Sequence, residues 1–256
     1  MCELFSLDGK VAAVVGGGGV LAGEMAMGLA RAGADVAILD FNREAADARA
    51  REIRDCDVRS LALRVDATRK GDLEEAREAI LAEFGRCDVL VNAAGINSGT
   101  PFLEISEQEW RQVMDVDLTS VFFACQVFGE VMIQPGNGGS IINISSASSG
   151  PPLSKVFAYS VAKAGVNQVT QYLAREWAPY RVRVNAILPG FFPAEQNRKL
   201  LTQDRVDKIM AHTPMARFGR PCELTGAVVY LASDRASGFV TGAILRVDGG
   251  YGAMTI

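Results

Sequence analysis

The chain has 256 residues, 49% hydrophobic and 22% charged, which fits one large α/β domain over residues 1–256 better than two small domains. Its formal net charge of −4 and the lack of a basic block argue against nucleic-acid binding. No apolar run reaches the ~18 residues that a membrane helix needs. The opening residues, MCELFSLDGK, lack the basic and apolar regions of a signal peptide. We therefore expect neither a nucleic-acid partner nor membrane attachment.

The five cysteines are scattered along the chain, and none belongs to a CxxC pair. This spacing argues against a disulfide framework and against a zinc site. It is typical of a protein kept in a reducing compartment. We therefore predict no metal site and a cytoplasmic location.

Short, apolar, β-branched runs alternate with segments of helical periodicity, as in sheets whose parallel strands are buried on both faces. Strands are expected at residues 11–15, 35–39, 61–65, 88–91, 141–144, 182–188 and 243–247, and helices at 21–32, 43–54, 70–84, 106–132, 158–177 and 222–232. The alternation predicts an α/β fold with a doubly wound parallel sheet and helices on both faces. Residues 189–221 have the least regular pattern, and we expect them to form a lobe before the last helix and strand.

Four consecutive glycines follow the first expected strand and precede a helix: Gly16, Gly17, Gly18 and Gly19. Glycines at this place permit a tight turn and a close approach of the backbone to a pyrophosphate, and the helix N-terminus favours an anion. The alternative is a glycine-rich turn without a ligand, but a tight turn alone does not need four glycines. The pattern indicates a dinucleotide-binding loop.

Acidic and amide residues follow the next three strands, at the strand ends where open α/β sheets bind ligands. Asp40 ends the second strand, Asp66 follows the third, and Asn92 begins the tetrapeptide NAAG after the fourth. An acid at the position of Asp40 can bind both hydroxyls of an adenosine ribose and repel a 2′-phosphate, so we predict NAD rather than NADP. The alternative for Asp40 is a helix cap, which Asn42 could supply instead. Asp66 and Asn92 could be simple turn residues.

Ser146, Tyr159 and Lys163 form a pattern suited to proton transfer. Tyr159 and Lys163 are four residues apart, so they share one face of the helix expected at 158–177. A free phenol has a pKa of about 10, too high for an efficient base at neutral pH, and an ammonium one helical turn away favours the phenolate. The serine hydroxyl can hold a substrate oxygen beside the phenol. The alternative is a surface lysine and a half-buried tyrosine at chance spacing.

Together with VNAILPG at residues 184–190 and VDGG at residues 247–250, these motifs closely resemble the short-chain dehydrogenase/reductase family over essentially the whole chain. The resemblance implies a Rossmann-like sheet of about seven parallel strands and hydride transfer between a nicotinamide and an alcohol/carbonyl pair. It implies that Tyr159 is the general acid/base, that Lys163 binds the nicotinamide ribose, and that Ser146 polarises the substrate oxygen.

The resemblance also implies the cofactor contacts and the assembly. A lobe at about 190–220 would cover the substrate. The long helices at 106–132 and 158–177 would form a dimer interface, and a second interface near the last strand would complete a homotetramer. The expected cofactor contacts are Gly16, Gly18, Leu21, Asp40, Asp66, Ala67, Asn92, Ala93, Gly95, Tyr159, Lys163, Pro189, Gly190 and Phe192.

Some positions depart from the family pattern. The usual first motif is TGxxxGxG, but Val15, Val20 and Ala22 stand in place of its threonine and its second and third glycines. The asparagine that usually belongs to the catalytic set is Asp117 here, which accepts hydrogen bonds but cannot donate one when ionised. We keep Asp117 among the catalytic residues, because an acid beside a lysine can still order a water. A threonine that usually contacts the cofactor is Ala194.

The glycine variant and the segments PGFFPAEQNRKLL and HTPMARFGRP resemble a subgroup of sugar-acid oxidoreductases, of the mannonate or fructuronate type. Residues 191–220 carry three more positive than negative charges on an acidic chain, which favours an anionic substrate. An arginine can bind a carboxylate through two hydrogen bonds, and we expect Arg198 to be the substrate contact. The alternative is a solvated helix face.

We therefore predict an NAD-dependent dehydrogenase of a sugar acid or polyol, and two other functions stay open. A 3-oxoacyl-carrier-protein reductase fits the same motifs, but that role usually favours NADPH, which Asp40 disfavours. A dinucleotide-binding regulatory protein without turnover would explain the replaced motif residues, whereas the intact serine, tyrosine and lysine oppose it.

Overall fold

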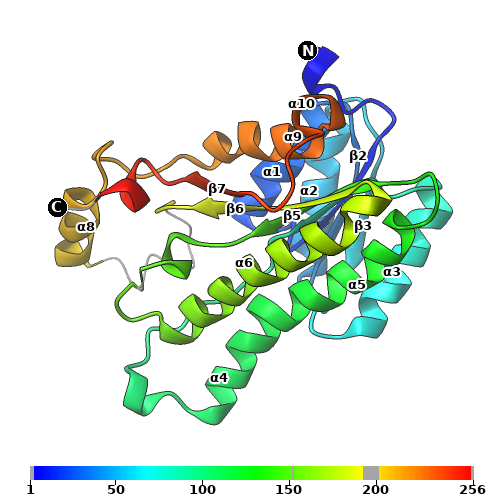
Figure 1. Ribbon diagram of the computed structural model, residues 1–256. Helices are drawn as coiled ribbons and strands as arrows, with labels where there is room; N and C mark the ends of the chain where they lie inside the picture. The colour runs from blue at the N-terminus through cyan, green and yellow to red at the C-terminus, as the bar shows by residue number, and fades with distance from the viewer. Residues whose placement is uncertain (1–2, 152, 193–201, 255–256) are drawn as a thin grey trace.

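The computed structural model describes residues 3–151, 153–192 and 202–254. Within these ranges seven strands pair in parallel in the order β3-β2-β1-β4-β5-β6-β7 (Figure 1). The strands are β1 (Val11–Val15), β2 (Asp35–Asp40), β3 (Ser60–Arg64), β4 (Val89–Asn92), β5 (Gly139–Ile144), β6 (Val182–Pro189) and β7 (Ile244–Val247). The predicted fold class is confirmed, because every expected strand is present with ends shifted by at most two residues.

Helices cover both faces of this sheet. They are α1 (Val20–Arg31), α2 (Arg43–Arg54), α3 (Lys70–Phe84), α4 (Glu107–Met114), α5 (Ser120–Met132), α6 (Phe157–Trp177), α8 (Gln203–Ala211), α9 (Thr225–Ala232) and α10 (Asp234–Ser237). Helices α1, α2 and α9 lie on one side of the sheet and α3, α5 and α6 on the other (Figure 1). The apolar residues of each group form a buried cluster with the sheet. Both faces of the central strands are therefore dry, which explains their uninterrupted apolar sequences.

The strand order reverses beside β1. From β1 the chain adds β2 and β3 on one side and then returns to add β4 to β7 on the other. Val15, the last residue of β1, is consequently paired with Leu39 of β2 and with Asn92 of β4. In open α/β sheets, ligands bind outside the carboxyl ends of the strands at such a reversal. The topology therefore marks the carboxyl edge of β1 and β4 as the expected binding site.

The single long helix expected at 106–132 is divided in the structure. One π-helical turn, η3 (Asp115–Thr119), separates α4 from α5. A π-helical turn takes one residue more than an α-helical turn and occurs mostly at functional sites. Asp117 lies in this turn, and its side chain is fully buried. The irregular turn thus brings a carboxylate into the protein interior.

The sequence pattern does not predict α10. Of the expected lobe, the structure describes residues 190–192 and 202–220, including α8. No helix in the described ranges combines the length and the apolar character needed to cross a membrane.

Candidate active site

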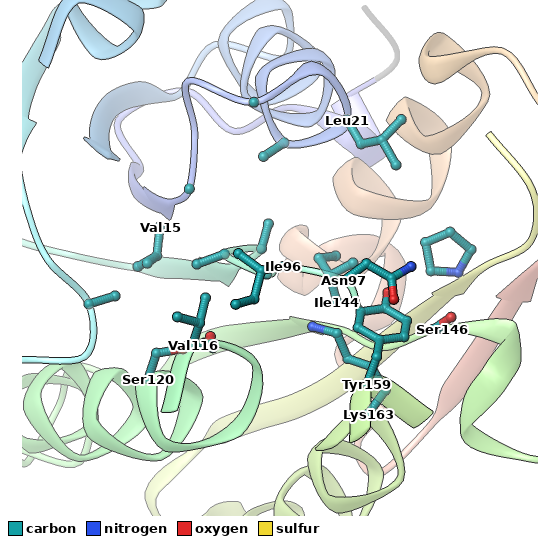
Figure 2. A pocket seen from close by; sticks show the side chains of 18 of the residues that line it. Val15, Leu21, Ile96, Asn97, Val116, Ser120, Ile144, Ser146, Tyr159 and Lys163 are labelled. Carbon is teal, nitrogen blue, oxygen red and sulfur yellow. Dashed lines mark hydrogen bonds between the residues drawn. The ribbon is translucent and has the colours of Figure 1, made fainter. Parts of the chain in front are cut away.

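A cavity of about 1350 Å³ lies at the carboxyl edge of the sheet (Figure 2). Six of the seven strands contribute a wall residue from their last position or from the loop that follows. These residues are Val15 for β1, Asp40 for β2, Val65 for β3, Ala93 for β4, Ile144 for β5 and Pro189 for β6. Residues that are far apart in sequence therefore share one site, as the strand order predicts.

Most of the predicted site residues line this cavity. All the expected cofactor contacts except Asn92 belong to its wall, as do Ser146, Tyr159 and Lys163. Asp117 lies buried beside Lys163. Arg198 and Ala194 lie outside the described residues.

Three of the four glycines, Gly16, Gly18 and Gly19, line the cavity at the end of β1 and lead into α1. Gly16 has a φ of +77°, and a Cβ at this position would lie 2.8 Å from the Ala94 Cα, so the turn needs glycine. Gly19 is the N-cap of α1 and supplies no side-chain cap. The cavity reaches Val20, Leu21 and Ala22, so the first-turn N–H groups are open to an anion there. The replaced motif residues therefore leave this helix N-terminus accessible.

Asp40 borders the glycine turn. Its Oδ2 accepts a hydrogen bond from the Gly18 N–H at 3.0 Å, and its Oδ1 accepts one from the Asn42 N–H at 2.8 Å. The cap of α2 is Asn42, whose Oδ1 accepts from the Ala45 N–H at 3.2 Å. The helix-cap alternative for Asp40 is therefore wrong, and the Asp40 carboxylate lies in the cavity wall.

Asp66 orders the loop after β3. Its Oδ1 accepts hydrogen bonds from the Thr68 N–H at 3.0 Å and from the Thr68 hydroxyl at 2.6 Å. The Asp66 N–H donates to Asp72 Oδ2 at 3.1 Å, at the start of α3. Asp66 is thus a turn residue and a cavity residue together.

Asn92 lies beneath the cavity floor. Its Nδ2 donates to Asn143 Oδ1 at 2.9 Å, and Asn143 Nδ2 donates to the Thr170 hydroxyl at 2.9 Å. All three side chains are buried. This chain of bonds joins β4, β5 and α6, so it supports the helix that carries Tyr159 and Lys163. A direct contact between Asn92 and a cofactor stays a prediction.

Ser146, Tyr159 and Lys163 lie at one end of the cavity, away from Val15 and Leu21 on the glycine side (Figure 2). Ser146 follows β5, and its Oγ accepts a hydrogen bond from the Ser148 N–H at 3.2 Å. Tyr159 lies half-buried in the first turn of α6, with Lys163 one turn later. The Lys163 Nζ is 5.5 Å from the centre of the Tyr159 ring. The ammonium and the phenol ring are therefore neighbours.

A buried ion pair joins Lys163 to Asp117. The Lys163 Nζ lies 3.3 Å from Asp117 Oδ1, and the two side chains are 4% and 0% exposed. Asp117 Oδ2 accepts a hydrogen bond from the Ile96 N–H at 3.0 Å, whereas Oδ1 accepts no aligned hydrogen bond from a described residue. Burial raises the pKa of the Asp117 carboxyl above its usual range, and the Lys163 charge and the Ile96 N–H oppose that shift. The buried Asp117 carboxylate is thus the counter-ion of the Lys163 ammonium.

These features fit a nicotinamide dinucleotide. An uncapped helix N-terminus suits the pyrophosphate, and the Asp40 carboxylate suits ribose hydroxyls. The serine, tyrosine and lysine at the far end provide the groups for proton transfer. No cluster of metal ligands is present in the described residues.

Several wall residues were not predicted from the sequence. They are Ile96 and Asn97 after β4, Leu153 and Val156 before α6, Phe191, Phe218 and Arg205. These lie in loops or in the lobe, where the sequence shows no periodic pattern. Four more wall residues that were not predicted lie on α4, namely Glu107, Gln108, Arg111 and Gln112. Only the charge excess of the lobe gave a signal for Arg205.

The family comparison covers most of the chain. A family model described as enoyl-(acyl carrier protein) reductase matches residues 19–252. An uncharacterised oxidoreductase of Bacillus subtilis is 41% identical over 96% of this chain and 96% of its own. The 2-dehydro-3-deoxy-D-gluconate 5-dehydrogenase of Escherichia coli is 38% identical over 96% and 97%. The D-threitol dehydrogenase of Mycolicibacterium smegmatis is 37% identical over 96% and 94%.

Solved structures of related enzymes have the same fold as this chain. A Haemophilus influenzae protein assigned as a D-mannonate oxidoreductase, with bound NAD, has a TM-score of 0.91 at 34% identity, over 98% of this chain and 97% of its own. A gluconate 5-dehydrogenase of Burkholderia cenocepacia, in complex with NADP and tartrate, has a TM-score of 0.94 at 35% identity, over 99% of both chains. Agreement of this extent in sequence and in fold shows that the chain belongs to the short-chain dehydrogenase/reductase family, close to its sugar-acid oxidoreductases.

Proposed function

We propose that this protein transfers a hydride between NAD(H) and the secondary alcohol or ketone of a sugar acid or polyol. The observation that carries the proposal is that Ser146, Tyr159 and Lys163 line the same cavity as Asp40 and the glycine turn. One site thus offers a place for the dinucleotide and a proton-transfer group. A screen of NAD reduction against sugar acids, polyols and simple secondary alcohols tests it, and failure of every alcohol would refute it.

The residues divide the chemistry between them. The bound nicotinamide supplies the hydride acceptor or donor. The Tyr159 hydroxyl exchanges a proton with the substrate oxygen, and the Ser146 hydroxyl holds that oxygen beside it. Lys163 favours the phenolate and offers its N–H groups to the cofactor ribose. The buried Asp117 carboxylate forms an ion pair with the Lys163 ammonium and so holds it in position.

The names of relatives support the substrate class. Two act on gluconate derivatives and one on threitol, and all three substrates are short polyhydroxylated chains. The lobe at about 190–220 would cover such a substrate within the single domain of residues 1–256. Arg198 stays a predicted contact in it.

NAD is the proposed cofactor because the Asp40 carboxylate lies where a 2′-phosphate would meet it. Related structures hold either NAD or NADP, so they do not choose between the two. Arg43 is paired with Asp47 at 2.8 Å, and Arg64 lies over the Phe41 ring at 5.0 Å. Both guanidinium groups therefore already have a partner within the protein and would have to leave it to bind a 2′-phosphate.

Replacing the phenol tests the acid/base role. Tyr159→Phe should fold and bind NADH normally but lose about 10² to 10⁴ in kcat, because only the ionisable oxygen is removed. Steady-state rates and a fluorescence titration of NADH measure both properties. Tyr180→Phe is the matched control, since Tyr180 is exposed just after the same helix and lies outside the cavity. A Tyr159→Phe enzyme with near-normal kcat would refute the role.

Replacing the ribose-site acid tests the cofactor choice. Asp40→Asn keeps the size of the side chain and an oxygen acceptor for the Gly18 or Asn42 N–H, but removes the negative charge. The ratio of kcat/KM for NAD to that for NADP should fall by about tenfold or more. Equal use of the two cofactors by the wild-type enzyme, or an unchanged ratio in the variant, would contradict the proposal.

Replacing the buried acid tests the ion pair. Asp117→Asn should preserve or raise kcat, because the amide keeps the size and restores an N–H donor. Rate profiles over the neutral and alkaline range check this, with the exposed Asp55→Asn as the control. A loss beyond about hundredfold at every pH would show that the carboxylate takes part directly.

The same variant has a signature in folding stability. Because the pKa of Asp117 is raised in the folded state, ionisation costs stability as pH rises from the unfolded value of about 4 through the folded one. Asparagine does not titrate. The unfolding free energy of Asp117→Asn minus that of the wild-type protein should therefore increase as pH rises toward neutrality. Urea unfolding at several acidic pH values measures it, and a constant difference would refute the raised pKa.

A homotetramer is the proposed assembly. On α5, Val121, Val127 and Phe128 pack on the sheet, but Phe122 is 46% exposed. Tyr172 of α6 is 64% exposed. The faces of α5 and α6 that carry Phe122 and Tyr172 should pack between two chains. The edge strand β7 should form the second contact between subunits. Light scattering at micromolar concentration should give four times the chain mass, and a monomer would refute the proposal.

A further inference from the structure

Among the described residues, the substrate end of the cavity carries a positive charge that no carboxylate pairs with. Three cationic side chains line the cavity in the described ranges, namely Arg111, Lys163 and Arg205. Arg111 is paired with Glu107 at 2.5 Å, and Lys163 is paired with Asp117 at 3.3 Å. Arg205 has no carboxylate within ion-pair distance among the described residues. Of the three, Arg205 is therefore the cation that is available to pair with an anionic ligand.

The side-chain hydrogen bond of Arg205 places it against the loop that precedes Tyr159. Arg205 lies in the first turn of α8, and its Nη2 donates to the Ser154 carbonyl oxygen at 3.1 Å. Ser154 belongs to the loop between Ser146 and Tyr159, and its neighbours Leu153 and Val156 line the cavity. The guanidinium is thus held over the loop that connects the serine to the tyrosine.

Aromatic side chains line the same cavity as Arg205, which is itself half-buried. Phe191, Phe192 and Phe218 line the cavity, and Phe191 packs edge-on against Tyr251 with ring centres 5.2 Å apart. Burial raises the pKa of Tyr251, and the charge of Arg205 opposes this shift. An arginine in such a setting interacts more strongly with an anion than an arginine in open water does. One N–H of Arg205 is bonded to Ser154, and its other donors can form a two-pronged contact.

We propose that Arg205 binds the carboxylate of the substrate and selects hydroxy acids over neutral polyols. This inference rests on the proposed function, since it places the reacting carbinol at Ser146 and Tyr159. The acid group would then lie toward α8, on the side of the cavity away from Asp40. A neutral polyol would fill the same space without a partner for the guanidinium. The competing role for Arg205 is structural, as a link between α8 and the loop that contains Ser154.

The experiment compares two acid/polyol pairs, D-gluconate with D-glucitol and D-mannonate with D-mannitol. Binding to the enzyme–NADH complex is measured by fluorescence or calorimetry, so it does not depend on turnover, and KM and kcat are measured for any compound that reacts. The variants are Arg205→Gln, which removes the charge, and Arg205→Lys, which keeps it. Lys208→Gln is the matched control, because Lys208 lies on the same helix, is 71% exposed and is paired with Asp204 outside the cavity.

Wild-type enzyme should bind at least one acid more tightly than its polyol. Arg205→Gln should weaken acid binding by about tenfold or more and leave polyol binding within about twofold. Arg205→Lys should recover part of the loss, and Lys208→Gln should match the wild type. Equal losses for acid and polyol would show a purely structural link, and a wild-type enzyme that binds neither acid more tightly than its polyol would overturn the inference. Turnover of neutral alcohols in those cases would leave the proposed function standing, whereas no turnover of any alcohol would refute that function separately.

Discussion

The common direction of all seven strands is the constraint on which the site depends. Parallel strands need crossover connections, so every strand delivers its carboxyl end to the same edge of the sheet. The reversal of strand order beside β1 puts α1 and α2 on one face of the sheet and α3, α5 and α6 on the other, which leaves the edge between β1 and β4 uncovered. Gly16, Asp40 and Tyr159 are far apart in the chain but line one cavity for this reason.

The second constraint is the cost of a buried charge. Lys163 lies almost entirely out of water, and leaving one member of a buried ion pair uncompensated costs about 3–5 kcal/mol. The π-helical turn places Asp117 behind it, and the Ile96 N–H holds the second carboxylate oxygen. A Cβ at Gly95 would lie 2.6 Å from Asp117 Oδ1, so this packing requires the glycine of NAAG. The strand-end motif and the irregular helix are therefore parts of one arrangement around Lys163.

Much of this architecture could be predicted from the sequence, because it follows from local patterns. Apolar runs gave the strands, and motifs at their ends gave most of the cavity wall. The π-helical turn was missed, because residues 115–119 contain no glycine or proline that would mark an interruption of the helix. The position of Arg205 was missed as well, because its contact with Ser154 joins segments 51 residues apart in a lobe without a regular pattern. The bonds of Asn92 to Asn143 and on to Thr170 also depend on the packing of distant elements.

Asp40 connects the choice of cofactor to the shape of the glycine turn. Its two oxygens are already engaged by the backbone N–H groups of Gly18 and Asn42, so the acid supports the turn whether or not a ribose is present. Removing the side chain would leave donors without a protein partner, at a cost of about 1–3 kcal/mol for each one that is shielded from water. A change to a 2′-phosphate cofactor would therefore require new partners for those donors and a release of Arg43 from Asp47 or of Arg64 from Phe41. The proposed preference for NAD thus depends on a set of backbone and side-chain contacts, and a single charge is only one part of it.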